Sequence, residues 1–238
     1  MRPFFSFYGS KFSSSCYYPD PKHDIIIEPF AGSAGYSVSR AKNRKVLLFD
    51  KDPTIVQIWK YLISVSEEEI LSLPDIENDQ TIDDLNICES AKLLIGFWLN
   101  KATSHPRKKP SSWMKSGHES YQFWSKNKRL MISKQLKNIR NWEIIQGDYS
   151  DVKNINATWF IDPPYIDKGK YYKFGSKKIN YNHLSEWCRS LNGQVIVCEQ
   201  KGADWLPFRE FKKVKSANHN YSQEVIWTKE CEIQQSLF

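Results

Sequence analysis

The alternation of short apolar runs with helical patterns in the first 65 residues most constrains the fold. Residues 24–28 (DIIIE) predict a buried strand, and a glycine-bearing turn leads into a helix that ends near Ala41. Residues 45–50 (KVLLFD) predict a second strand. Asp52 and Pro53 then supply an N-cap and a first-turn proline for a helix over residues 54–65. This succession predicts a parallel sheet with right-handed crossovers.

The pattern becomes mainly helical after residue 72. One helical face is predicted by the spacing of Ala91, Leu94, Ile95, Trp98, Leu99 and Ala102. A basic loop covers residues 104–112, and a second helical pattern runs from about residue 126 to 140. Strands resume at 143–146, 157–162 and 194–199, followed by a pair near 211–215 and 224–228. We therefore expect an α/β protein whose sheet domain comprises residues 1–72 and 141–238, with a helical insertion over residues 73–140.

The positive charge of the chain is concentrated in this insertion. Residues 101–140 hold eleven Lys/Arg and one acid, Glu119, so they carry +10 and the remainder about −3 of the net +7. Such a segment suits a polyanion, although most charge runs are solvated helical faces. Aromatic residues beside the cations favour nucleic acid; they are Trp98, Trp113, Tyr121, Phe123 and Trp124.

Other classes of protein have little support. No stretch is apolar enough to span a bilayer, and the N-terminal residues do not resemble a signal peptide. The five cysteines are scattered, without a CxxC pair, which argues against a disulfide framework and a zinc site. The five histidines are equally dispersed, so we expect no metal, no membrane partner and a cytoplasmic location.

The turn after the first strand, residues 28–35 (EPFAGSAG), predicts a ligand site. Gly32, Ala34 and Gly35 let the backbone approach a ligand closely, although such turns are also glycine-rich for structural reasons. Asp50 ends the next strand, where a carboxylate is placed to accept hydrogen bonds from two ribose hydroxyls. Its alternative role as an N-cap is already filled by Asp52. Together these residues favour a cofactor that contains adenosine.

The second chemical signal is Asp162-Pro163-Pro164-Tyr165, which follows an apolar strand. The lone pair of an adenine amine is delocalised into the ring, so the amine is a poor nucleophile. The Asp162 carboxylate and the Pro163 carbonyl are two acceptors for its hydrogens, and binding both would free the lone pair for attack on a methyl group. Pro163 and Pro164 hold the acceptors rigidly, and Tyr165 offers a flat surface for an extruded base. A strained turn without function is the alternative.

With these motifs in this order, the chain resembles the Dam-type (D12 class) DNA adenine N6-methyltransferases over roughly residues 4–65 and 143–230. The resemblance implies a Rossmann-like methyltransferase sheet, S-adenosyl-L-methionine as cofactor and a target-recognition insertion. It implies that Phe7 and Lys11 surround the methionine part of the cofactor. Asp50 would bind the ribose, and Asp148 would contact the adenine. Asp162 would belong to both the cofactor and the target pockets. By the same resemblance, four further residues are expected to bind the cofactor: Glu28, Pro29, Phe30 and Gly32.

Two departures from the family pattern bear on these expectations. The second glycine of the family's FxGxG is Ala34 here, followed by Gly35. The insertion matches no recognition domain, so the DNA sequence that it would read is not assigned. The residues expected to contact DNA are Lys101, Arg107, Lys108, Lys109, Lys126, Lys128, Arg129, Lys170 and Tyr171. The last two belong to residues 167–178, which we expect to form a loop that clamps DNA or closes over the flipped base, or else a disordered surface loop.

The last five residues carry a separate hypothesis. Gln234, Gln235, Ser236, Leu237 and Phe238 resemble the peptide with which bacterial replication proteins dock on the sliding clamp. A frayed tail is the alternative.

The expected function is site-specific methylation of adenine N6 in DNA. An N4-cytosine methyltransferase would use similar chemistry, but related enzymes often have Ser at the position of Asp162, and RNA-directed relatives often have Asn. A non-catalytic DNA-binding protein that retains a methyltransferase fold is a further alternative. The intact Lys11, Asp50 and Asp162 argue against it.

Overall fold

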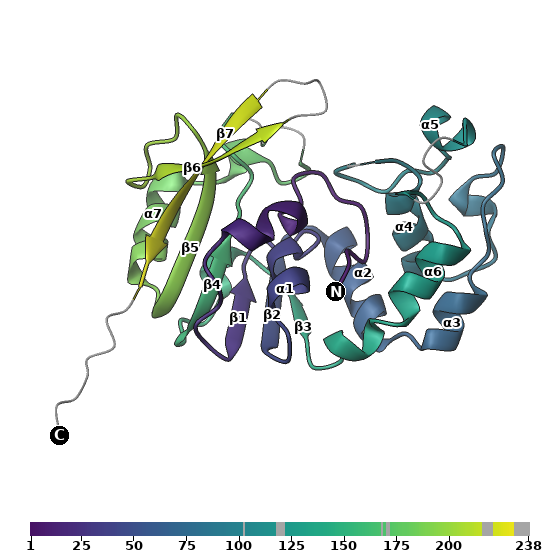
Figure 1. Ribbon diagram of the computed structural model, residues 1–238, viewed down its shortest axis with the longest axis horizontal. Coiled ribbons are helices and arrows are strands. Elements are labelled where there is room, and N and C mark those ends of the chain that lie inside the picture. Colours follow the sequence, from purple (N-terminus) through teal and green to yellow (C-terminus); the bar gives the residue numbers. More distant parts are fainter. Residues whose placement is uncertain (102, 118–121, 168, 170–171, 216–220, 231–238) are drawn as a thin grey trace.

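The computed structural model describes residues 1–101, 103–117, 122–167, 169, 172–215 and 221–230. A seven-stranded, mostly parallel sheet with the order β3-β2-β1-β4-β5-β7-β6 forms its centre (Figure 1). The strands are β1 (Ile25–Glu28), β2 (Lys45–Asp50), β3 (Glu143–Gln146), β4 (Ala157–Ile161), β5 (Gly193–Gln200), β6 (Arg209–Lys215) and β7 (Tyr221–Lys229). The chain is thus an α/β protein, as the strand pattern predicts.

The strand order determines where a ligand can bind. Strands β3, β2, β1, β4 and β5 are parallel, whereas β7 runs antiparallel to both β5 and β6. From β1 the chain moves outward to β2 and β3, then returns to the other side of β1 as β4. Doubly wound sheets bind ligands outside the carboxyl ends of the strands at such a switch point. Glu28 ends β1 at this crevice, and Asp162 directly follows β4.

Both faces of the sheet are covered, which explains why its central strands are continuous apolar runs. Alternate residues of a strand point to opposite faces, so Phe160 packs into one apolar cluster and Trp159 and Ile161 into the other. Helices α1 (Gly35–Arg40) and α2 (Pro53–Ser64) contribute to the first cluster, and α7 (Tyr181–Ser190) contributes to the second.

Helix α2 forms where the sequence predicts it and for the predicted reason. The Asp52 side chain accepts a hydrogen bond from the Thr54 amide at 3.0 Å, and Pro53 occupies the first turn. Its buried residues follow helical spacing, which gives the helix one apolar face; they are Ile55, Val56, Ile58, Trp59 and Leu62.

The helical segment between α2 and β3 lies beside the β3 side of the sheet, at the opposite end of the molecule from β6 (Figure 1). It contains α3 (Glu67–Ser72), α4 (Glu89–Trp98), α5 (Ser112–Lys115) and α6 (Lys126–Ser133). Leu94 and Ile132 of this segment belong to the same apolar cluster as Trp59 of α2. The helical segment therefore packs directly against the sheet domain.

The structure differs from the sequence predictions in several helices: α4 ends at Trp98 although the predicted helical face extends to residue 102, and α5 (Ser112–Lys115) was not predicted. The predicted helix over 126–140 is wrong in extent, because α6 ends at Ser133 and a 3-10 helix follows over Leu136–Ile139. Helix α3 was not predicted, although Ser66 caps it and three glutamates fill its first turn. Helix α7 was also not predicted, although Asn180 caps it. Leu184 and Cys188 are its buried apolar residues, and the polar residues around them weaken the helical periodicity of the sequence. Within the described residues no helix is long and apolar enough to cross a membrane.

Candidate functional site

A pocket of about 1010 Å³, part of it open to solvent, lies at the carboxyl ends of the parallel strands. Four sequence segments that were singled out separately meet in it: the N-terminal residues, the loop after β1, the end of β2 and the turn after β4. Its lining includes Phe7, Lys11, Glu28, Pro29, Phe30, Gly32, Asp50, Asp148, Asp162 and Pro164. All nine residues expected to hold a cofactor therefore line one pocket.

Lys11 is buried at this site, with only 6% of its surface exposed. Its ammonium lies 3.0 Å from Asp162 Oδ1 and 3.7 Å from Glu224 Oε1, and it donates a hydrogen bond to the Gly9 carbonyl at 3.1 Å. Burial alone would lower the pKa of Lys11, but Asp162 and then Glu224 raise it above its ordinary value. Lys11 is therefore a fixed buried cation between two carboxylates.

Asp162 keeps an acceptor available despite this ion pair. Its Oδ1 is buried and accepts no hydrogen bond of standard geometry from the described residues, and the Tyr165 hydroxyl is likewise buried without one. Burial raises the pKa of Asp162, while the nearby Lys11 opposes that rise. Because Oδ1 lies 3.0 Å from the Lys11 ammonium, it is ion-paired, and the capacity of Asp162 to accept from a ligand rests on the remaining lone-pair positions of its carboxylate.

The other residues of the tetrapeptide have different surroundings. Pro164 lines the pocket, and its carbonyl accepts a hydrogen bond from the Tyr181 hydroxyl of α7. Pro163 is buried. The ring of Tyr165 lies 4.8 Å from the Lys11 ammonium and packs against the first apolar cluster. Tyr165 is thus in contact with the charged residues of the site, and its stacking on a base stays a prediction.

The loop after β1 is tied to the end of β2 through Asp50. Oδ2 of Asp50 accepts a hydrogen bond from the Gly32 amide at 2.9 Å, and Oδ1 accepts one from the Asp52 amide at 2.8 Å. Gly32 adopts a φ of +44°, in the left-handed region that favours glycine. A carboxylate offers about four lone-pair positions, so each oxygen of Asp50 can accept a second hydrogen bond.

Ala34 and Gly35 begin α1 under close steric constraint. Ala34 has a φ of +48°, a left-handed conformation that costs an alanine roughly 1–2 kcal/mol. A glycine would adopt this left-handed conformation without that cost, as at the second glycine of the FxGxG motif that the sequence resembles. Gly35 has no space for a side chain, since a Cβ would lie 2.6 Å from the Phe12 amide nitrogen and 2.8 Å from that of Lys11.

We expect Gly35→Ala to destabilise the protein by about 1–3 kcal/mol, because the added methyl group would push away the backbone that carries Lys11. Ala34→Gly, the neighbouring control, relieves left-handed strain and should leave stability unchanged or raise it by up to about 1 kcal/mol. Urea denaturation of both variants measures these changes. Equal stability of Gly35→Ala and the wild type would contradict the close approach.

Asp148 and Phe30 line the side of the pocket near β3. The Asp148 carboxylate pairs with the Lys51 ammonium and accepts a hydrogen bond from the Ser150 amide. Phe30 stacks on Tyr149 with ring centroids 5.5 Å apart, and the Tyr149 hydroxyl hydrogen-bonds to His183 Nδ1 at 2.7 Å. A carboxylate beside a flat aromatic surface is suited to an adenine ring, which has both a polar edge and an apolar face.

Residues that follow the tetrapeptide form another wall of the pocket. Tyr172, Lys173 and Phe174 line it, and the Tyr172 hydroxyl donates to the Tyr8 carbonyl at 3.1 Å. Lys173 lies 3.6 Å from Asp52 at the start of α2. This segment therefore contacts both the N-terminal residues and the loop after β2. Its predicted DNA contacts, Lys170 and Tyr171, fall outside the described residues, as do Gln234, Gln235, Ser236, Leu237 and Phe238 of the clamp-like peptide.

The basic loop of the helical segment begins at the pocket. Ser104 lines the pocket, and the Thr103 carbonyl accepts a hydrogen bond from the Tyr8 amide at 3.0 Å. The loop backbone is anchored further on, where the Arg107 amide donates to the Gly96 carbonyl of α4 at 2.9 Å. The predicted DNA-contact residues on this loop have exposed side chains; they are Lys101, Arg107, Lys108 and Lys109.

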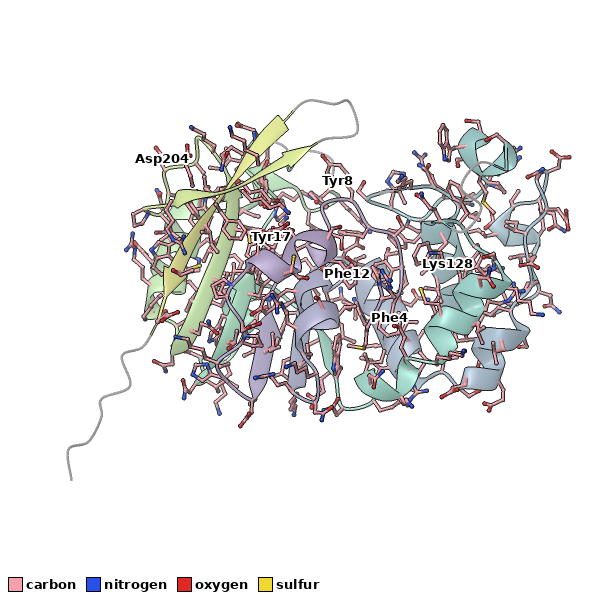
Figure 2. The ribbon with its side chains drawn as sticks, viewed as in Figure 1. Phe4, Tyr8, Phe12, Tyr17, Lys128 and Asp204 are labelled. Carbon is pink, nitrogen blue, oxygen red and sulfur yellow. The ribbon has the colours of Figure 1, made fainter. Side chains whose placement is uncertain are left out.

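The predicted contacts on α6 are placed differently from one another. Lys126 is exposed. Lys128 is on α6 (Figure 2). Its ammonium lies 4.0 Å from the centre of the Trp98 ring, and burial lowers the pKa of Lys128. Arg129 is only 8% exposed, and its Nη1 lies 2.5 Å from Asp75 Oδ1. The guanidinium of Arg129 thus holds the helical segment together, a role that its position in a basic run does not reveal.

Glu224 and Tyr172 are the site residues that sequence reasoning missed. Glu224 lies on β7, and its contact with Lys11 requires the antiparallel pairing of β7 with β5. Only the alternation of residues on a predicted strand could have indicated which face Glu224 occupies. Tyr172 stood among other aromatic residues without a signal that separated it from them.

The described residues contain no group of three or more His, Cys, Asp or Glu side chains that could hold a metal ion. Comparison with protein-family models finds no match for this chain, and no curated protein matches it significantly.

Proposed function

We propose that this protein is a DNA methyltransferase that uses S-adenosyl-L-methionine to methylate the N6 amine of adenine. The observation that carries the proposal is one pocket that gathers every residue expected to bind the cofactor, with the Asp162 carboxylate and its buried partner Lys11 in its lining. The strand order β3-β2-β1-β4-β5 supports it, because doubly wound sheets of this order bind adenosine-containing ligands at their switch point.

The residues present fit the proposed cofactor. Asp50 retains acceptor positions for ribose hydroxyls, and Gly32 leaves space for backbone approach. Asp148 and Phe30 suit an adenine ring, while Lys11 provides a cation for the carboxylate of a methionine part. When bound, S-adenosyl-L-methionine supplies an electrophilic methyl group.

Asp162 would act on the nucleophile. An ionised Asp162 would accept one amine hydrogen on its carboxylate, and the Pro163 carbonyl would accept the other. This interaction returns the lone pair of the nitrogen from the ring to the attacking orbital. The N–C bond would form as the C–S bond of the methyl donor breaks, S-adenosyl-L-homocysteine would leave, and the methylated amine would release one proton to solvent. Hydrogen bonds that strengthen as positive charge develops on the amine stabilise the transition state more than the bound substrate.

The DNA part of the proposal rests on position and charge. Arg107, Lys108 and Lys109 are exposed on a loop whose first residues meet the pocket. A base that reaches Asp162 must leave the duplex, so its flanking phosphates would lie at the pocket entrance. Exposed cations on the loop that leads away from the pocket suit such phosphates without reading the sequence.

The proposal is tested with purified protein, unmethylated genomic DNA and cofactor carrying an isotope-labelled methyl group. After digestion to nucleosides, we expect the label in N6-methyldeoxyadenosine. Label in N4-methyldeoxycytidine would contradict the choice of base, and absence of label from DNA under all conditions would contradict the proposed activity.

Cofactor binding should weaken in acid through Asp50. Burial raises the pKa of Asp50 to about 6, so its carboxylate, the form that accepts best from ribose hydroxyls, becomes protonated below that pH. We expect the dissociation constant of S-adenosyl-L-homocysteine to rise by up to about tenfold per pH unit below pH 6. Asp50→Asn should bind more weakly and lose this dependence.

Calorimetric titration between pH 5 and 8 checks the expectation. Asp20→Asn, which changes an exposed acid paired with Arg40, is the control and should follow the wild type. An unchanged affinity of Asp50→Asn at pH 7 would exclude the ribose role.

A further inference from the structure

Glu224 of β7 belongs to the charge arrangement around Asp162 but does not line the pocket. The Lys11 ammonium has three hydrogens to donate and three acceptor groups around it: the Gly9 carbonyl, Asp162 Oδ1 and Glu224 Oε1. Only 13% of the Glu224 side chain is exposed. One buried cation therefore faces two carboxylates, which leaves the three groups with a charge of −1 when all are ionised.

The position of Glu224 is fixed from its other oxygen. The Tyr18 hydroxyl donates to Glu224 Oε2 at 3.1 Å. The Tyr18 ring is held in turn by stacking on Phe211 at 4.6 Å and by an edge contact with Phe160 at 5.1 Å. An aromatic support of this kind places the Glu224 carboxylate on the side of Lys11 and prevents it from turning away.

We infer that Glu224 is a positioning residue that shares the Lys11 ammonium with Asp162, so that the Asp162 carboxylate keeps enough negative charge to accept a hydrogen from the substrate amine beside its ion pair. The inference rests on the proposed methyl transfer. Without the charge of Glu224, Lys11 would interact with Asp162 alone and neutralise the carboxylate that the amine needs. The Lys11 ammonium lies 3.0 Å from Asp162 Oδ1 and 3.7 Å from Glu224 Oε1, so it interacts with both carboxylates and is closer to Asp162.

The electrostatic effects agree in sign with this arrangement. Glu224 raises the pKa of Lys11 and that of Asp162, so it strengthens the cation and makes the Asp162 carboxylate a better acceptor. Loss of the Glu224 charge would lower the pKa of Asp162. Among the described residues, the other titratable groups that face this cluster are Tyr18, Glu28, Tyr165, Tyr172, Cys198 and Glu199.

The test compares Glu224→Gln with the wild type in steady-state methyl transfer over a range of pH. Glutamine has the same shape but no charge, and it leaves Lys11 and Asp162 as a neutral pair, so the variant should fold. We expect kcat at pH 7.5 to fall by about tenfold, the equivalent of one pKa unit of interaction. The KM for the cofactor should change little, and the acid limb of the kcat profile should move to lower pH.

Three matched variants complete the experiment. Glu224→Asp keeps the charge and should keep the wild-type acid limb with a smaller loss of kcat. Tyr18→Phe removes only the hydroxyl that holds Glu224 and should also lose less kcat than Glu224→Gln. Glu230→Gln makes the same substitution in an exposed pair with Lys22 and should match the wild type.

The outcomes separate this inference from the proposed function. A wild-type protein that transfers no methyl group to DNA overturns the proposed function itself. An active wild type with a Glu224→Gln variant of equal kcat and equal acid limb overturns the positioning role alone. A purely structural role would lower the melting temperature of Glu224→Gln while leaving kcat per folded molecule and the acid limb unchanged, and this result would also overturn the inference.

Discussion

Asp162→Ala is expected to abolish methyl transfer while the chain stays folded. The substitution removes the carboxylate acceptor that lines the pocket, and loss of one preorganised group at a reacting centre costs roughly 10²–10³-fold in rate. Here the loss should be at the upper end, since the amine depends on its acceptors to become nucleophilic. Folding should survive because Lys11 retains Glu224 and the Gly9 carbonyl as partners, so no buried charge is left unpaired.

Single-turnover methylation with saturating cofactor measures this effect, and circular dichroism checks the fold. Asp204→Ala serves as the control, because Asp204 is an exposed acid that follows β5 and does not line the pocket. It should retain wild-type kcat. An Asp162→Ala variant that is folded and fully active would refute the role of the tetrapeptide.

Replacing Arg107, Lys108 and Lys109 together by glutamine should weaken DNA binding at every sequence. The three side chains are exposed on the loop whose first residues meet the pocket, and phosphate contacts of this kind carry no base information. If each contacts one phosphate, the slope of log K against log salt should become shallower by about 0.9 per charge, or roughly 2.7 in all. At low salt the affinity loss should be the largest of any surface variant.

The control changes three cations at the opposite edge of the sheet. Lys22, Lys42 and Lys153 are exposed and precede the amino ends of β1, β2 and β4. Lys22 pairs with Glu230 as Lys108 pairs with Asp83, so each set includes one ion-paired lysine. Equal salt dependence of the two triple variants would move the DNA surface away from the basic loop.

Much of the sheet could be predicted because its strands are short apolar runs with clear boundaries. Strands β2 and β3 have the predicted ends, and the cap by Asp52 was read correctly because N-cap geometry is local. Helix α7 was missed, since a short helix with a polar exposed face has little periodic signal. Helix α6 ends early for a tertiary reason: Leu136 and Ile139 are buried from a 3-10 turn instead.

The pocket residues could be predicted because each follows a strand or begins a turn, and parallel strands bring such positions to one edge. The environment of each residue could not. Burial of Arg129 against Asp75 depends on the packing of α6 near residue 75, and the approach of Glu224 to Lys11 joins residues from the two ends of the chain. The distribution of charge along the sequence therefore predicts which segment is basic. It does not predict which of its cations, such as Arg129, are buried in ion pairs.

Transfer of a methyl group to adenine in DNA can be measured by modification-sensitive sequencing of DNA from a methylation-free bacterial host that expresses this protein. Expression of the wild-type chain should produce N6-methyladenine at one recurring sequence, and expression of Asp162→Ala should produce none. Absence of N6-methyladenine with a folded, cofactor-binding wild-type protein, or equal methylation by both chains, would overturn the proposed adenine methylation.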